Sequence, residues 1–153
     1  MADLTLSSPA FEDGGPIPEQ YGYTAANVNP PLDVSNVPSS AESLVLVVDD
    51  PDAREPAGKI WDHWVVWNVP PDVGSIPEGW DAVAAGATEG ENDFGETGWG
   101  GPNPPDREHT YRFLLYALDA TLDLGPGASK DDVYDAAEGN VVGKAHLEGT
   151  YAP

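Results

Sequence analysis

The sequence contains no cysteine among its 153 residues. Without a thiol, the chain forms no disulfide framework, no thiolate metal site and no redox pair, and it has no cysteine nucleophile. Long apolar runs are missing too, because the longest, residues 44–48, is far shorter than the roughly 20 residues that cross a bilayer. Residues 1–11 carry neither a basic leader nor a long apolar segment. We therefore expect no integral membrane insertion and a cytoplasmic protein.

Basic residues are scarce, with 6 lysines and arginines against 27 acidic residues and a net charge of −21. Such a charge repels phosphate backbones, so the composition argues against nucleic-acid binding. The acidity fits either a basic partner or bound cations, or else life in molar salt, where the Debye length is about 3 Å and surface repulsion is screened. Because the acids are spread along the whole chain, the sequence favours a salt-adapted surface.

Glycine and proline are abundant, with 17 and 16 copies. This share demands many turns but stays below the level typical of low-complexity disorder. The length suits one domain, residues 1–153, with a proper core. Strands are expected at residues 5–11, 44–49, 63–69, 111–118 and 141–151. The intervening segments 18–37 and 72–90 are expected to form an ordered loop or irregular edge strand and a turn-rich surface.

One helix is expected, over residues 129–139. Ser129 is a favourable N-cap, and Asp131 and Asp132 interact favourably with the positive end of the helix dipole. Gly139 can terminate the helix. Alternation along the strands assigns the faces. It places His109, Tyr111 and Phe113 on one face of their strand, and it groups a second set on one face of the segment 63–69: His63, Val65, Trp67 and Val69. Together these elements predict a mostly β, sandwich-like fold with one short late helix.

Three groups of residues could carry chemistry, each at the end or start of an expected strand. They are Asp50-Pro51-Asp52, His63, and the pair His109 and Tyr111, which follows a rigid loop rich in glycine and proline. Taken singly, each group also fits a turn or a core position. Their residue types leave open a metal-dependent hydrolase that uses Asp50, Asp52, His63 and His109 as ligands, since carboxylate and imidazole suit zinc or manganese.

The order of five motifs carries a resemblance. They are VDDPDA (48–53), WDHWVVWNVP (61–70), NDFGETGWGGPNPP (92–105), HTYRFLLYALD (109–119) and LEGTY (147–151). In this order and spacing the chain resembles the phosphatidylethanolamine-binding protein family, in its small bacterial and archaeal branch of Raf-kinase-inhibitor-like proteins. The resemblance implies a two-sheet Greek-key β-sandwich-like fold and a pocket that binds small anions such as phosphate or a phospholipid headgroup. It also suggests a homodimer.

The resemblance implies which residues form this pocket: Asp50, His63, Gly101, Pro102, His109 and Tyr111, supported by Asp52 and Trp61. Imidazole, phenol and backbone N–H groups can together bind phosphate without a metal or cofactor. Asp50 would orient His63 and favour its protonated form. The chain departs from the family pattern at Arg54 and Thr110, where proline and arginine are usual. We expect a non-enzymatic anion-binding protein with a regulatory role and an unassigned protein partner.

Overall fold

Strand β4 (Ser43–Asp50) lies in the middle of a six-stranded sheet, and all of its residues are buried. Its apolar, β-branched sequence suits a strand that is covered on both faces. The structure, a computed structural model, describes residues 3–153. The sheet has the order β2-β9-β8-β4-β5-β7, and its other strands are β2 (Gly15–Pro16), β9 (Val141–Tyr151), β8 (His109–Leu118), β5 (Trp61–Val69) and β7 (Thr88–Glu89).

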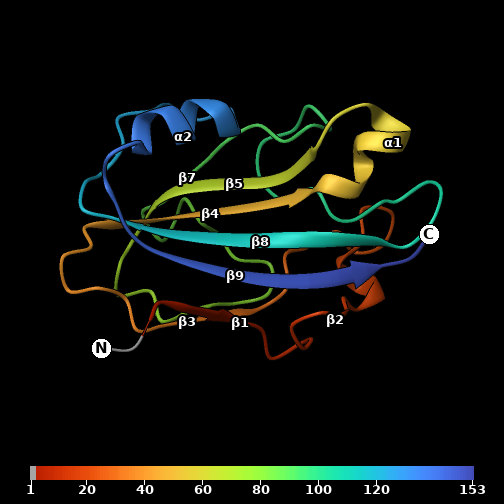
Figure 1. Ribbon diagram of the computed structural model, residues 1–153, viewed down its shortest axis with the longest axis horizontal. Helices are drawn as coiled ribbons and strands as arrows, with labels where there is room; N and C mark the ends of the chain where they lie inside the picture. The colour runs from red at the N-terminus through yellow and green to blue at the C-terminus, as the bar shows by residue number, and fades with distance from the viewer. Residues whose placement is uncertain (1–2) are drawn as a thin grey trace.

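The two faces of this sheet are covered differently (Figure 1). Helix α2 (Lys130–Ala137) lies over one face, above a small core that includes Val45, Trp67 and Val133. A three-stranded antiparallel sheet covers the other face, with strands β1 (Thr5–Ser7), β3 (Leu32–Ser35) and β6 (Ser75–Ile76). The main core lies between the two sheets and includes Leu32, Trp64 and Phe113. The predicted mostly β, two-sheet fold with a short late helix is confirmed.

The strong strands and the late helix lie where the sequence predicts them, while the weaker segments differ in detail. Helix α2 begins with a capping box, in which Ser129 and Asp132 each accept the other's backbone N–H. The first strand is shorter than expected, and residues 18–37 contain both β3 and a 3₁₀ helix (Glu19–Tyr21). A second short helix, α1 (Arg54–Ala57), was not predicted. It follows a 3₁₀ turn (Pro51–Ala53) and ends at Gly58, whose φ is 76°.

One predicted strand face is wrong at both ends. His63 packs on Tyr111 at the main core, because Val48 pairs with Trp64 and Asp49 with Asp62, so that β5 has an extra residue at His63. Val65 and Trp67 pack beneath α2 as expected, but Val69 joins Trp64 and Val66 in the main core. The reason is a bulge: Val66 pairs with Leu46 and Val69 with Leu44, so that one strand has an extra residue, and Asn68 adopts a φ of 55°. An extra residue shifts the alternation by one and turns the next side chain to the opposite face.

The antiparallel pairing brings several strand ends together at one end of the molecule. Asp50, the last residue of β4, pairs with Trp61, the first residue of β5. On the other side of β4, Asp49 pairs with Arg112, three residues into β8. Figure 1 shows α1 at this same end, close to the C-terminus. The segments that carry the candidate site residues therefore meet here.

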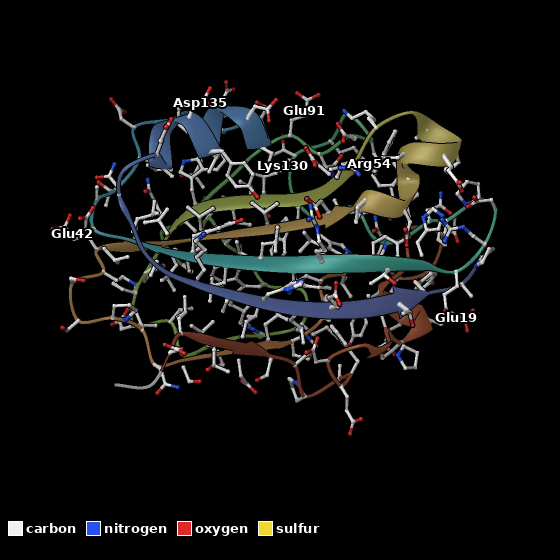
Figure 2. All side chains as sticks on the ribbon, viewed as in Figure 1. Glu19, Glu42, Arg54, Glu91, Lys130 and Asp135 are labelled. Atoms are coloured by element: carbon white, nitrogen blue, oxygen red, sulfur yellow. The ribbon has the colours of Figure 1, made fainter. Side chains whose placement is uncertain are left out.

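The acidic residues lie almost entirely on the surface. All 27 of them lie within residues 3–153, and there only Asp49 and Asp50 are buried. Figure 2 shows labelled examples, Glu19, Glu42, Glu91 and Asp135, around the outline of the molecule. No helix in residues 3–153 is both long and apolar enough to cross a membrane.

We expect the fold to need salt. Surface carboxylates of one sign repel one another, and molar salt screens that repulsion because the Debye length falls to about 3 Å. Circular dichroism in molar KCl should show full β structure, and dialysis into dilute buffer should weaken it and lower the melting temperature. A melting temperature that stays the same across this range would contradict a salt-adapted surface.

Candidate functional site

A cavity of about 210 Å³ lies at the end of the sheet where β4 finishes and β5 and β8 begin. It brings together five of the predicted residues from three different strands. They are Asp50 on β4, Trp61 and His63 on β5, and His109 and Tyr111 on β8. The remaining lining residues come from the turns around the mouth: Ala53, Pro56, Ala57, Phe94, Asn103 and Pro105.

Asp50 is the buried carboxylate of the site. Its Oδ1 accepts the backbone N–H of Asp52 at 2.9 Å, which caps the 3₁₀ turn that follows β4. Its Oδ2 lies 2.6 Å from Nδ1 of His109. Burial raises the pKa of Asp50, and the hydrogen bond from His109 opposes that rise. Asp50 therefore both holds the turn and orients a histidine.

His109 lies between two carboxylates. Its Nδ1 is 2.6 Å from Asp50 Oδ2, and its Nε2 is 2.7 Å from Asp106 Oδ1. Burial of the ring opposes the charged form, but the two carboxylates together raise the pKa of His109 above its ordinary value. An imidazolium has an N–H on each nitrogen, so the charged ring donates to both partners. His109 is the cationic group of the pocket.

His63 has a different environment. Its Nδ1 lies 2.6 Å from the backbone oxygen of Gly100, and its ring packs edge-on against Phe94 and Tyr111. Burial lowers the pKa of His63 to about 4, although nearby backbone oxygen favours the charged form. The ring is therefore neutral at pH 7. Because Nδ1 donates its proton to Gly100, Nε2 carries a lone pair and acts as an acceptor.

The predicted hydrogen bond between Asp50 and His63, and the protonated state of His63, are wrong. Register explains the difference, because Asp50 pairs with Trp61 and His63 lies two residues further along β5. The carboxylate of Asp50 reaches the neighbouring strand instead and binds His109. Period-two alternation assigns side chains to a face but does not say which of two histidines a carboxylate meets.

Two polar groups that belong to lining residues are buried without a partner in residues 3–153. They are the hydroxyl of Tyr111 and the indole N–H of Trp61. Burial and the nearby Asp50 raise the pKa of Tyr111, so the phenol keeps its proton. An unpaired buried donor costs about 1–3 kcal/mol, and such groups in native structures call for an explanation. Both groups belong to residues that line the cavity, next to His109.

Gly101, Pro102 and Asp52 take supporting places and do not line the cavity. The N–H of Gly101 donates to Asn27 Oδ1 at 2.7 Å, and a Cβ at this glycine would collide with the backbone oxygen of Tyr21. The carbonyl of Pro102 accepts the N–H of Tyr23 at 2.9 Å. The expectation that this loop offers backbone donors to a ligand is therefore wrong at Gly101, because its N–H already has a partner.

Asp52 and the two departures from the family pattern lie at the rim. Asp52 Oδ2 accepts the backbone N–H of Thr110 at 2.9 Å, so this carboxylate joins the 3₁₀ turn to the start of β8. The side chain at position 110 is only partly buried, and Arg54 is an exposed residue at the start of α1. The departures change the surroundings of the pocket and leave its central residues in place.

Sequence reasoning missed Asp106 and Phe94. Phe94 stacks on Tyr23 with ring centroids 4.0 Å apart and meets Trp61 edge-on at 5.5 Å, so it forms the aromatic wall of the mouth. It is the single large apolar residue in the segment 92–98, which was an available signal. Asp106 lies in an irregular loop, and no periodicity marks it as a partner of His109.

The residues of the hydrolase alternative do not form a metal site. Within residues 3–153, no three histidine or acidic side chains are arranged to hold a metal ion. Both nitrogens of His109 already have carboxylate partners, and Nδ1 of His63 faces a carbonyl oxygen. The described part of the chain thus offers no ligand set for that chemistry.

Comparison with known proteins gives a consistent set of relatives. The profile of the family described as phosphatidylethanolamine-binding protein matches residues 7–152. A UPF0098 protein of Methanothermobacter thermautotrophicus is 48% identical over 151 residues, which cover 97% of this chain and 98% of that protein. A crystal structure of a phosphatidylethanolamine-binding protein homolog from Chlamydia trachomatis has a TM-score of 0.92 at 39% identity and covers 99% of this chain and 98% of its own. The structure of E. coli YbcL, described as a member of the mammalian PEBP family, has a TM-score of 0.89 at 29% identity, with 98% of each chain covered.

Proposed function

The chain belongs to the phosphatidylethanolamine-binding protein family, and from this premise we propose that its pocket binds a small phosphorylated ligand and catalyses no reaction. One observation carries the proposal. The pocket cation, His109, already holds an anionic oxygen at its Nε2, which lies 2.7 Å from Asp106 Oδ1. A ligand phosphate oxygen fits the same place, because its charge and its acceptor geometry match those of the carboxylate.

Two further donors support a ligand with several oxygens. The hydroxyl of Tyr111 and the indole N–H of Trp61 are both buried and unpaired within residues 3–153, and both residues line the cavity with His109. A phosphate group presents three or four oxygens and can accept from all of these donors at once. A carboxylate or halide satisfies fewer of them. The donor set therefore favours a phosphate over simpler anions.

The neutral His63 adds a requirement on the ligand. Its Nε2 is an acceptor, because Nδ1 donates to Gly100. A phosphate that keeps one proton can donate its P–OH to this nitrogen while its other oxygens accept. A net charge of −21 repels anions at long range, so affinity depends on these short contacts and benefits from salt.

Replacement of Tyr111 by phenylalanine tests the proposal without disturbing the fold. A hydrogen bond to a charged group contributes about 1.5–3 kcal/mol, so the affinity for phosphate and phosphoethanolamine should fall by about tenfold or more. Folding stability should change by less than about 1 kcal/mol, since the hydroxyl makes no well-aligned hydrogen bond in residues 3–153 and only lies near Asp50 and the backbone of Asn103. Calorimetry in molar KCl with a chelator present measures the affinities. The two ligands distinguish a site for phosphate alone from one that also takes the amine.

Tyr134→Phe is the matched control. Its hydroxyl lies 3.3 Å from that of Tyr116, beneath α2 and outside the cavity, so its loss should leave binding unchanged. Equal affinity of the wild type and Tyr111→Phe would contradict the proposed contact. Binding that disappears with the chelator would instead indicate a metal-dependent site. A regulatory role, a homodimer and a cytoplasmic location stay predictions.

A further inference from the structure

The carboxylate that binds Nε2 of His109, the cation of the pocket, belongs to a loop of the protein itself. Asp106 follows Pro104 and Pro105, and Pro105 lines the cavity. The Asp106 side chain is 37% exposed, whereas that of His109, which it contacts at 2.7 Å, is 0% exposed. We propose that Asp106 is a tethered anion that competes with ligands for Nε2 of His109 and thereby sets which anions the pocket accepts. This inference rests on the proposed function.

The tether makes the competition strong. A charge-assisted hydrogen bond to a buried imidazolium is among the stronger polar contacts. Because Asp106 is three residues from His109 in the sequence, and two prolines restrict the chain before it, the carboxylate is always close to the ring. Linkage of this kind gives an effective concentration far above that of a free ligand. Any ligand that needs His109 must therefore overcome the same competitor.

The contact is nevertheless easy to open. The other ion pairs between this loop and the rim come from Arg107, whose guanidinium lies 3.8 Å from Asp52 and 3.6 Å from Glu55. All three side chains are at least one-third exposed, and exposed ion pairs contribute little to stability. Asp106 and Arg107 are themselves exposed and belong to neither hydrophobic core. Displacement of Asp106 thus breaks one strong hydrogen bond and leaves the core intact.

The free energy needed to displace Asp106 from His109 determines which anions bind. A monoanion such as acetate offers His109 the same kind of oxygen that Asp106 offers, so it gains little when it displaces Asp106. A phosphate gains the same contact and also reaches Tyr111 and Trp61, whose donors are otherwise unpaired. Asp106 lowers the affinity of every ligand that binds His109 by the same factor. Ligands with a single contact then bind too weakly to be detected, whereas ligands with several contacts still bind.

The test compares Asp106→Ala with Glu108→Ala. Glu108 is an exposed carboxylate in the same loop with no contact to His109, so the control changes the net charge equally. Calorimetry at about pH 6 keeps His109 charged through Asp50. Asp106→Ala should bind inorganic phosphate about tenfold more tightly than the wild type, and it should acquire measurable acetate binding. Glu108→Ala should resemble the wild type. Equal phosphate affinity in Asp106→Ala and the wild type, or weaker affinity in the variant, would overturn the inference.

A ligand-free measurement separates this inference from the proposed function. NMR titration of His109 reports the contact itself, and the charged or titratable groups around the ring are Asp50, Asp106, Asp52, Arg107 and Tyr111. Loss of Asp106 should lower the pKa of His109, while Glu108→Ala should leave it unchanged. If this shift is seen but neither protein binds phosphate, the proposed function fails. If the wild type binds and the pKa does not move, the competition alone fails.

Discussion

Replacement of Lys130 by methionine is expected to lower the free energy of unfolding by about 3–5 kcal/mol, the usual effect of breaking a buried ion pair. Lys130 is the first residue of α2, and Figure 2 shows it between that helix and β5. Its ammonium lies 2.6 Å from Asp62 Oδ1 and 3.3 Å from Asp49 Oδ2. The three side chains are only 13%, 15% and 1% exposed.

The two carboxylates differ in how much they depend on Lys130. Asp49 keeps a second cation, because Arg112 binds both of its oxygens at 2.7 and 2.8 Å. Asp62 has no other cation in contact within residues 3–153, and burial raises its pKa while Lys130 opposes that rise. Without Lys130, Asp62 stays largely shielded from solvent beside Asp49 and Asp93 with no compensating charge. The variant should therefore recover part of its stability at mildly acidic pH, where Asp62 takes up a proton.

Guanidinium or urea unfolding in molar KCl measures the loss, and Lys144→Met provides the control. Lys144 is exposed on β9 and makes no ion pair in residues 3–153, so its removal changes the net charge equally. Its effect should stay within about 0.5 kcal/mol. A loss below about 1 kcal/mol for Lys130→Met would mean that solvent reaches this group and that the ion pairs contribute little.

Stability is also expected to fall by about 3 kcal/mol between pH 6.5 and pH 4 because of His63 alone. Burial lowers its pKa to about 4 in the folded state, against about 6.5 when unfolded. Between these values the unfolded chain binds a proton that the folded chain does not, so stability decreases as pH falls. Each pH unit contributes about 1.4 kcal/mol, and the loss is complete below pH 4. His109 has the opposite sign, because its raised pKa gives a contribution that is present below about pH 6.5 and is lost at higher pH.

The His63→Asn variant isolates this term from the titration of the many carboxylates. An asparagine amide can donate to the Gly100 oxygen in place of Nδ1 but does not titrate. The difference in unfolding free energy between wild type and variant should shrink by about 3 kcal/mol as pH falls from 7.5 to 4. A difference that is independent of pH would show that the folded state accommodates a charged His63.

The strands that carry strong patterns were predictable, and so was the end of the sheet at which the site lies. Residues 44–49 and 111–118 are apolar and regular, and the capping residues of α2 are explicit in the sequence. The face of Val69 was predicted wrongly because a bulge depends on how two strands pair, and the sequence around Asn68 does not indicate it. The short helix α1 was missed because four residues show no helical period.

The composition of the pocket was predictable to a similar extent. Asp50, Trp61, His63, His109 and Tyr111 were named from the sequence, and they do meet in one cavity. Their pairing was not predictable, because it depends on which side chain crosses between strands. Asp106 was missed for a related reason. A carboxylate in a chain with 27 acidic residues carries no information until a fixed partner such as His109 is known.

The position of Trp61 gives the chain a built-in optical probe. Of its five tryptophans, Trp61 is the one that lines the cavity, whereas Trp64 and Trp67 are fully buried in the two cores. A ligand in the cavity changes the surroundings of this one indole, while unfolding exposes all five to water. Small changes in emission at constant fold therefore report occupancy, and a large red shift reports loss of the fold, so both can be followed in one unlabelled sample.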